Sequence, residues 1–235
     1  RSQKTSESLS PVASNSAQTS GGFTLHPWLQ LLRIGNVFTA FANILMGYLV
    51  VLSDAGILTL RIRDAWPLAG LLAATFCLYS SGMVLNDVFD IEQDKKQRSN
   101  RPLAAGVIPL RVAVWFGMGL MLAGILFAST AGMRGCLLGS AIAVSVLLYN
   151  RVLKKTPLAP LMMGMCRTLN VLLGMSYVVS DKAIFCGFEK HHLFIAGGIG
   201  VFVTGLTWFA RTEARTSNRW LLSFGVAIMA LGFVC

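Results

Sequence analysis

Residues 66–94 read WPLAGLLAATFCLYSSGMVLNDVFDIEQD, an apolar run that ends in a group of acidic side chains. Residues 66–86 contain no charged side chain, and a helix of that length crosses the hydrocarbon core of a bilayer, which is about 30 Å thick. Comparable apolar segments occupy residues 28–52, 111–131, 134–150, 158–180, 192–210 and 219–235. The sequence therefore predicts an all-α, polytopic transmembrane bundle of about seven helices.

The composition of the chain favours a membrane protein over a soluble one. Its 235 residues are 54% hydrophobic and 13% charged, whereas about a quarter of the residues in soluble domains are charged. A net charge of +10 would indicate a nucleic-acid partner in a soluble domain, but membrane proteins gather Lys and Arg in their cytoplasmic loops. We therefore interpret the positive charge as a sign of topology and expect no nucleic-acid partner.

The distribution of the basic residues predicts the orientation in the membrane. Lys and Arg are concentrated in the loops 95–111, 151–155 and 211–219, and loops of this kind face the cytoplasm. We therefore expect a multi-pass integral membrane protein of the bacterial inner membrane, or of an organellar equivalent. Its N-terminus and these three loops would lie on the cytoplasmic side.

The two ends of the chain differ from its middle. Residues 1–22 are rich in Ser, Thr, Gln and Gly and nearly lack large apolar side chains, so they cannot offset the entropy cost of ordering by burial. We predict a disordered cytoplasmic tail over 1–22 and a transmembrane domain over 23–235. Because the chain opens with Arg and its last apolar segment has no polar end, we interpret it as a fragment.

The acidic end of the segment quoted above indicates a metal site. Asp87, Asp90 and Asp94 stand at positions i, i+3 and i+7, so they share one face if the helix continues. Like charges repel, and ionisable groups next to a membrane are costly and usually functional. Carboxylate oxygens suit Mg²⁺, which proteins commonly bind together with substrate phosphates. The pattern predicts Mg²⁺ held by the three aspartates, with Asn86 assisting one turn before Asp90.

A basic group follows the acidic one directly. Lys95, Lys96, Arg98 and Arg101 are placed to bind the diphosphate oxygens that the metal leaves free. In the alternative interpretation, the acidic and basic side chains only satisfy each other as exposed ion pairs.

Several of these segments resemble a known family. Residues 86–94, NDVFDIEQD, resemble the first aspartate-rich motif, NDxxDxxxD, of the UbiA superfamily of intramembrane prenyltransferases, and residues 98–103, RSNRPL, resemble its RxxRPL segment. The likeness runs from about residue 28 to the end. Further matching residues, in the stretch around the family's fourth and fifth helices, are Tyr149, Asn150, Arg151, Lys154, Lys155, Thr156, Arg167, Asn170 and Gly174.

The resemblance implies both a fold and an activity. The fold would be a truncated form of a nine-helix bundle around a central cavity. The activity would be Mg²⁺-dependent transfer of a prenyl chain, within the membrane, from a polyprenyl diphosphate to a lipophilic acceptor, often aromatic. Membrane lipid would be a further partner, because the prenyl chain of the substrate can lie in the bilayer before it binds.

The chain departs from the family in one place. Members usually carry a second aspartate-rich motif, of DxxxD type, in the loop after the sixth helix, whereas residues 208–219 read WFARTEARTSNR with Glu213 as the single acid. Glu213 is either a metal ligand or the partner of a neighbouring arginine, and arginines can replace the charge of a second metal. The alternative is a degenerate protein that acts as a lipid carrier or an assembly partner.

Other polar residues inside apolar segments are also candidates. Arg167 needs an anionic partner, and the aspartate face is the expected one. Asn170 and Asn36 either line the cavity or bond a neighbouring helix. Lys154 is either a topology signal or a phosphate ligand, and the adjacent His191 and His192 are interpreted as interfacial.

The predicted site therefore has three groups of residues. The predicted catalytic residues are Asp87, Asp90, Asp94 and Arg167, of which the three aspartates are also the predicted metal ligands. The predicted substrate-binding residues are Asn86, Lys95, Arg98, Arg101, Lys154, Asn170, Glu213 and Asn36.

Overall fold

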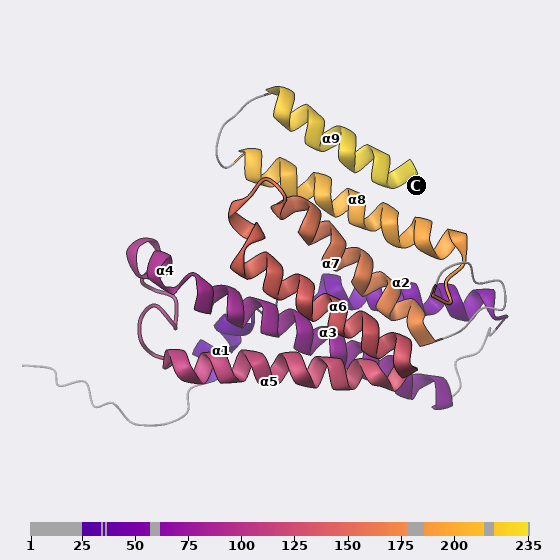
Figure 1. Ribbon diagram of the computed structural model, residues 1–235, viewed down its shortest axis with the longest axis horizontal. Helices are drawn as coiled ribbons and strands as arrows, with labels where there is room; N and C mark the ends of the chain where they lie inside the picture. The colour runs from indigo at the N-terminus through magenta and orange to yellow at the C-terminus, as the bar shows by residue number, and fades with distance from the viewer. Residues whose placement is uncertain are drawn as a thin grey trace, which may run out of the picture.

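The computed structural model describes residues 25–33, 35, 37–56, 62–177, 186–213 and 219–234. The regular elements named within these ranges are helices, which confirms the predicted all-α class (Figure 1). The predicted tail over residues 1–22 and the candidate Asn36 lie outside the described residues.

The helices follow one another as an elongated bundle. In chain order they are α1 (Leu25–Leu32), α2 (Phe38–Asp54), α3 (Ile62–Phe89), α4 (Ile91–Gln97), α5 (Leu110–Ala128), α6 (Gly132–Arg151), α7 (Ala159–Gly174), α8 (Lys190–Glu213) and α9 (Arg219–Val234). Three helical stretches in the described part of the chain are long and apolar enough to cross a membrane: Ala65–Phe89, Leu110–Arg151 and Lys190–Glu213. The apolar helices α2 and α9 are shorter. The chain is thus an integral membrane protein with several helical spans.

Two predicted boundaries are wrong. The segment 28–52 was expected to be one helix, but it forms α1 and α2, and Arg33 between them has a φ of 48°, in the left-handed region that L residues disfavour. The turn between the apolar segments 111–131 and 134–150, which follow each other as an antiparallel hairpin, was expected at Gly132–Gly135. It lies instead at the short 3₁₀ helix Ser129–Ala131, and α6 begins directly at Gly132, where φ is 82° and glycine is the residue without a steric penalty.

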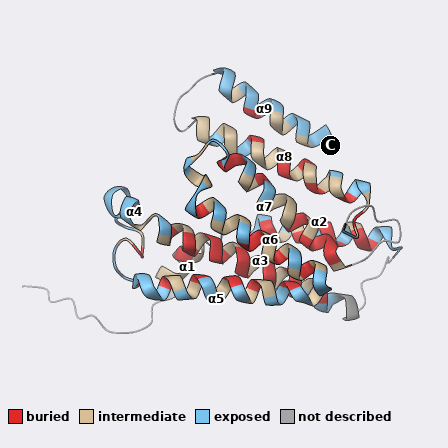
Figure 2. Ribbon diagram, in the orientation of Figure 1, coloured by how far each residue is buried: buried red, intermediate tan, exposed pale blue. Residues whose placement is uncertain are grey.

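Helix α3 is the centre of the bundle. It packs against α5, α6, α2 and α1, and Figure 2 shows that buried residues gather along it. Its buried side chains include Leu71 and Leu78, which join Ile44 of α2 and Leu173 of α7 in one apolar cluster. The outer helices instead expose large apolar side chains such as Trp115 of α5, as a surface in contact with lipid requires.

Helices α2 and α7 approach closely enough for their backbones to touch. A Cβ atom at Gly47 would lie 2.5 Å from the carbonyl oxygen of Val171, and one at Gly174 would lie 2.6 Å from that of Ile44. Small residues permit this kind of contact, which is common between membrane helices. The close contact sets the position of α7 against α2 and α3, and thereby the width of the space between these helices. Helix α8 packs on α7, and α9 packs on α8 at the edge of the bundle (Figure 1).

Candidate active site

A cavity of about 280 Å³ lies between the helices, as the family resemblance implied. Helices α3, α6 and α7 provide most of its wall, with Arg33 and Ala40 from the region of α1 and α2. Much of the lining is apolar, from side chains such as Leu78 and Val146. The polar residues of the lining are Arg33, Thr75, Tyr79, Asn86, Tyr149, Asn150, Arg167 and Asn170. The cavity can therefore hold a hydrocarbon chain and bring its polar end to a few specific groups.

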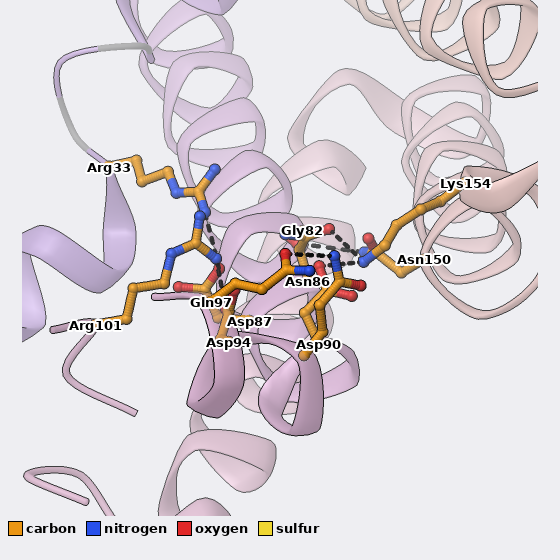
Figure 3. Close-up of polar contacts among 11 residues, drawn as sticks. Arg33, Gly82, Asn86, Asp87, Asp90, Asp94, Gln97, Arg101, Asn150 and Lys154 are labelled. Atoms are coloured by element: carbon orange, nitrogen blue, oxygen red, sulfur yellow. Dashed lines mark hydrogen bonds and ion pairs between the residues drawn. The ribbon is translucent and has the colours of Figure 1, made fainter. Parts of the chain in front are cut away.

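The aspartates lie where α3 gives way to α4. Helix α3 ends at Phe89, and Asp90 is a turn residue before α4, so the continuing helix that was expected is interrupted there. The hydrogen bonds remain helix-like, because the N–H of Asp90 donates to the oxygen of Asn86 at 3.0 Å and the N–H of Asp94 donates to that of Asp90 at 2.8 Å. Asp87 and Asp94 face one group of cations, while Asp90 faces another (Figure 3).

Arg101 joins two of the aspartates. Its Nη1 lies 3.0 Å from Oδ1 of Asp87 and 2.6 Å from Oδ2 of Asp94. The exposed fractions of these two carboxylate side chains are 4% and 7%, so the carboxylates are buried, whereas the Arg101 side chain is 22% exposed. Arg33 contacts the same oxygen of Asp87 with its Nη2 at 2.8 Å. The alternative of exposed ion pairs in this segment is wrong for Asp87 and Asp94.

Lys154 is the cationic partner of the third aspartate, Asp90. It lies in the short 3₁₀ helix Leu153–Lys155 after α6, forms an ion pair with Asp90, and donates from Nζ to Oδ1 of Asn86 at 3.1 Å (Figure 3). Because Asn86 and Arg33 also line the cavity, the aspartate cluster is joined to the cavity wall through both residues.

The donor set of this cluster suits a hard divalent cation. It consists of carboxylate and amide oxygens, the ligand atoms that such ions prefer. One further oxygen is available, because Oδ1 of the buried Asn150 has no hydrogen-bond partner, whereas its Nδ2 donates to the oxygen of Gly82 at 3.3 Å. Buried polar atoms are nearly always satisfied, so an unpaired acceptor in the cavity wall fits a bound ion or its water. The residues present therefore fit a metal ion that binds together with a phosphate group.

Arg167 and Asn170 line the cavity from α7. The sequence predicted an aspartate partner for Arg167, and this prediction is wrong: Nη2 of Arg167 donates to Oγ1 of Thr39 at 3.1 Å. The position of Arg167 on α7 turns its guanidinium towards α2. Nδ2 of Asn170 donates to the backbone oxygen of Ala40 at 2.9 Å, and its Oδ1 accepts a hydrogen bond from the hydroxyl of Thr75. Asn170 thus both lines the cavity and links three helices.

Three predicted site residues lie apart from this arrangement. Lys95 is exposed and pairs with Glu92 at 3.4 Å, while Arg98 is exposed at the end of α4 and Glu213 at the end of α8. In the part of the chain that the structure describes, none of the three lines the cavity. The fold brings together Asn86, Asp87, Asp90, Asp94, Arg101 and Lys154.

The sequence-based site omitted Arg33, and it omitted Asn150 although that residue is part of the family resemblance. A signal for Arg33 was available, because a charged residue within an otherwise apolar segment is usually functional. Asn150 had the same kind of signal as a polar residue at the end of a transmembrane helix.

A second polar cluster lies at the other end of α2. Oδ2 of Asp54 lies 2.7 Å from Nε2 of both His191 and His192, at the start of α8. Such atoms are potential metal ligands, and they lie within 4.8 Å of one another. However, the N–H of Glu189 donates to Nδ1 of His192 at 3.1 Å, which leaves Nε2 of that ring to donate to Asp54. The geometry is that of a hydrogen-bonded clasp between α2 and α8.

The fold and the site together define a class: a helical membrane protein whose internal cavity ends at a partly buried cluster of aspartates and cations. The chain belongs to the UbiA prenyltransferase family, whose model matches residues 40–219. Arg33 precedes the matched range.

Curated relatives agree with this assignment. The chain is 30% identical over 134 residues to the digeranylgeranylglyceryl phosphate synthase of Methanococcoides burtonii, covering 55% of this chain and 47% of the relative. It is 32% identical over 134 residues to the synthase of Saccharolobus solfataricus, covering 57% and 45%. The matched part is thus about half the length of these relatives.

A solved structure shares the fold. It is described as that of a digeranylgeranylglyceryl phosphate synthase in membranes, and the two chains superpose with a TM-score of 0.68 at 21% identity. The superposition covers 89% of this chain and 75% of the other. The helical bundle is therefore the fold of a known membrane enzyme.

Proposed function

We propose that the protein transfers a prenyl chain from a polyprenyl diphosphate to a lipophilic acceptor within the membrane. The observation that carries the proposal is the cluster of the buried Asp87 and Asp94 with the partly buried Asp90, paired with cations and joined to a largely apolar cavity. The diphosphate would bind at the cluster and the hydrocarbon chain would lie along the cavity wall. Family membership and the names of the relatives support the same reaction class.

The cofactor of this reaction would be Mg²⁺, held by the three aspartates with Asn86. When bound, it supplies positive charge that stabilises the departing diphosphate. Arg101 and Lys154, which contact the aspartates, are within reach to donate hydrogen bonds to phosphate oxygens. The apolar wall around Leu78 and Val146 excludes water from the positive charge that develops on C1 of the prenyl chain.

The bond changes balance without a further reactant. The bond between C1 and the diphosphate oxygen breaks, and a nucleophilic atom of the acceptor forms the new bond to C1. Diphosphate and the proton lost by the acceptor leave as products. Two acceptor classes follow from the sequence and the relatives: an aromatic ring, and a prenylglyceryl phosphate of the kind that the names of the relatives indicate.

The orientation is part of the proposal. The loop that holds Arg101 and the segment that holds Lys154 lie in the basic regions predicted to be cytoplasmic, so the diphosphate would enter from the cytoplasm. The charged substrate would then not cross the membrane.

The test is prenyl transfer by the variants Asp87→Asn and Asp90→Asn. Membranes containing the chain would be incubated with radiolabelled prenyl diphosphate, Mg²⁺ and either acceptor class. We expect transfer by the parent chain, its loss on addition of EDTA, and a loss of at least about 100-fold in both variants, because each removes a charged ligand. The control is Glu92→Gln, which removes a carboxylate whose side chain is 79% exposed on α4. Unchanged transfer by both aspartate variants would remove the proposed mechanism.

A further inference from the structure

Arg33 holds an unusual place in the site. Its guanidinium contacts Asp87 at 2.8 Å and also lines the cavity, although the residue precedes the range that the family model matches. The oxygen of Asp87 that it contacts is the one that Arg101 contacts at 3.0 Å. Asp87 therefore has two cationic partners.

The backbone around Arg33 holds this contact in place. Arg33 follows α1, whose Leu31 is fully buried and whose Trp28 packs edge-on against Phe116 of α5 at 5.0 Å. Its φ of 48° is disfavoured for an L residue, and such a conformation persists only where the surrounding packing determines it. The side chain is nevertheless 32% exposed, so the guanidinium has room to move while its backbone stays fixed.

The formal charges of the cluster sum to zero. Asp87, Asp90 and Asp94 are matched by Arg33, Arg101 and Lys154. A free divalent cation would leave this buried cluster with two excess positive charges, and the displaced arginines would have no anion to receive them. A divalent cation that arrives with diphosphate also brings phosphate oxygens, to which the guanidinium groups can turn.

The geometry points to Arg33 as a charge gate on the metal site, an inference that rests on the proposed function. Paired with Asp87, Arg33 weakens binding of a free divalent cation. When metal and diphosphate arrive together, its guanidinium leaves Asp87 and donates to the diphosphate oxygens. Arg33 is thus a substrate-binding residue that makes metal binding depend on the diphosphate of the substrate.

The inference predicts two opposite effects of one substitution. In Arg33→Gln, a free divalent cation should bind at least about tenfold more tightly than in the parent chain, because one competing charge is removed. Inorganic diphosphate in the presence of Mg²⁺ should bind at least about tenfold more weakly, because one donor to its oxygens is lost. A residue that only supported the fold would weaken both affinities together.

The experiment uses the purified full chain in detergent micelles. Affinity for Mn²⁺ alone would be measured from the electron paramagnetic resonance signal of the free ion, and affinity for radiolabelled inorganic diphosphate by equilibrium dialysis at saturating Mg²⁺. The variants are Arg33→Gln, Arg33→Lys, Asp87→Asn and the control Arg111→Gln, which removes an exposed arginine near the start of α5. We expect Arg33→Lys and Arg111→Gln to bind Mn²⁺ as weakly as the parent chain does, because Arg33→Lys keeps the charge.

Two results would overturn the gate while leaving the proposed function intact. One is Mn²⁺ affinity in Arg33→Gln within twofold of the parent chain, with Asp87→Asn still abolishing Mn²⁺ and diphosphate binding. The other is equally tight Mn²⁺ binding by Arg33→Lys and Arg33→Gln, which would exclude charge as the cause. Failure of the parent chain and of every variant to bind Mn²⁺, with or without diphosphate, would instead overturn the proposed function and the gate with it.

Discussion

Replacing Arg101 with Gln removes the cation that Asp87 and Asp94 share. Oδ1 of Asp87 and Oδ2 of Asp94 contact Nη1 of Arg101 at 3.0 and 2.6 Å, so the two oxygens lie within about 5.6 Å of each other. At an effective dielectric constant of about 20, two unit negative charges at that separation repel each other by about 3 kcal/mol. Arg33 still neutralises part of the charge on Asp87, but no described ion pair then remains at Asp94. We therefore expect Arg101→Gln to lower the free energy of unfolding by about 3 kcal/mol, as is usual when one partner of a buried ion pair is removed.

The assay is thermal unfolding of the purified chain in detergent, followed by circular dichroism. For a chain of this size, a loss of about 3 kcal/mol corresponds to a fall in midpoint of roughly 6 to 12 °C. Millimolar Mg²⁺ should restore much of this loss, because the cation can take the charge position that Arg101 has left, and a ligand that binds the folded state stabilises it. The same addition should change the parent chain less.

The control is Arg111→Gln, whose side chain is exposed and which should stay within about 0.5 kcal/mol of the parent chain. An unchanged midpoint for Arg101→Gln would refute the view that Asp87 and Asp94 are charged, buried and close together. A lowered midpoint that Mg²⁺ does not raise would refute the view that these carboxylates can hold a divalent cation.

Three further predictions concern other contacts. Lys154→Gln should reduce prenyl transfer at least about tenfold while leaving helicity unchanged, because it removes the ion pair of Asp90 and a donor to the diphosphate. A transfer rate within twofold of the parent chain would contradict this role of Lys154. Asp54→Asn should lower the free energy of unfolding by about 1 to 3 kcal/mol, because it weakens the hydrogen bonds of the clasp between α2 and α8. A thermal unfolding midpoint equal to that of the parent chain would show that the clasp does not stabilise the fold. Gly174→Leu should prevent α7 from packing on α2, because a Cβ atom there already lies 2.6 Å from the oxygen of Ile44; a monodisperse, stable variant in size-exclusion chromatography would show that the helices can separate.

The helical class and the position of the acidic motif could be predicted because both depend on residues that are near in sequence. The length of an apolar run decides whether a segment can span a bilayer, and residues 66–86 meet that condition without reference to any other segment. The aspartates and Arg101 lie within 15 residues of one another, so their proximity follows from a helix end and a short loop. The break at Arg33 was missed because hydropathy averages over a left-handed residue inside an apolar segment.

The partners of these residues could not be predicted, because they come from distant parts of the chain. Arg33 and Asp87 are 54 positions apart, Lys154 and Asn86 are 68 apart, and Arg167 and Thr39 are 128 apart. Which side chains meet across such separations depends on the rotation of each helix about its axis and on the close contact of α2 with α7. The amino-acid order alone thus specifies a membrane-spanning helical chain with an acidic helix end. The packing of the helices then decides that Arg33 and Lys154 join Arg101 in neutralising that end, because distant charges are paired by their distance in space rather than by their distance along the chain.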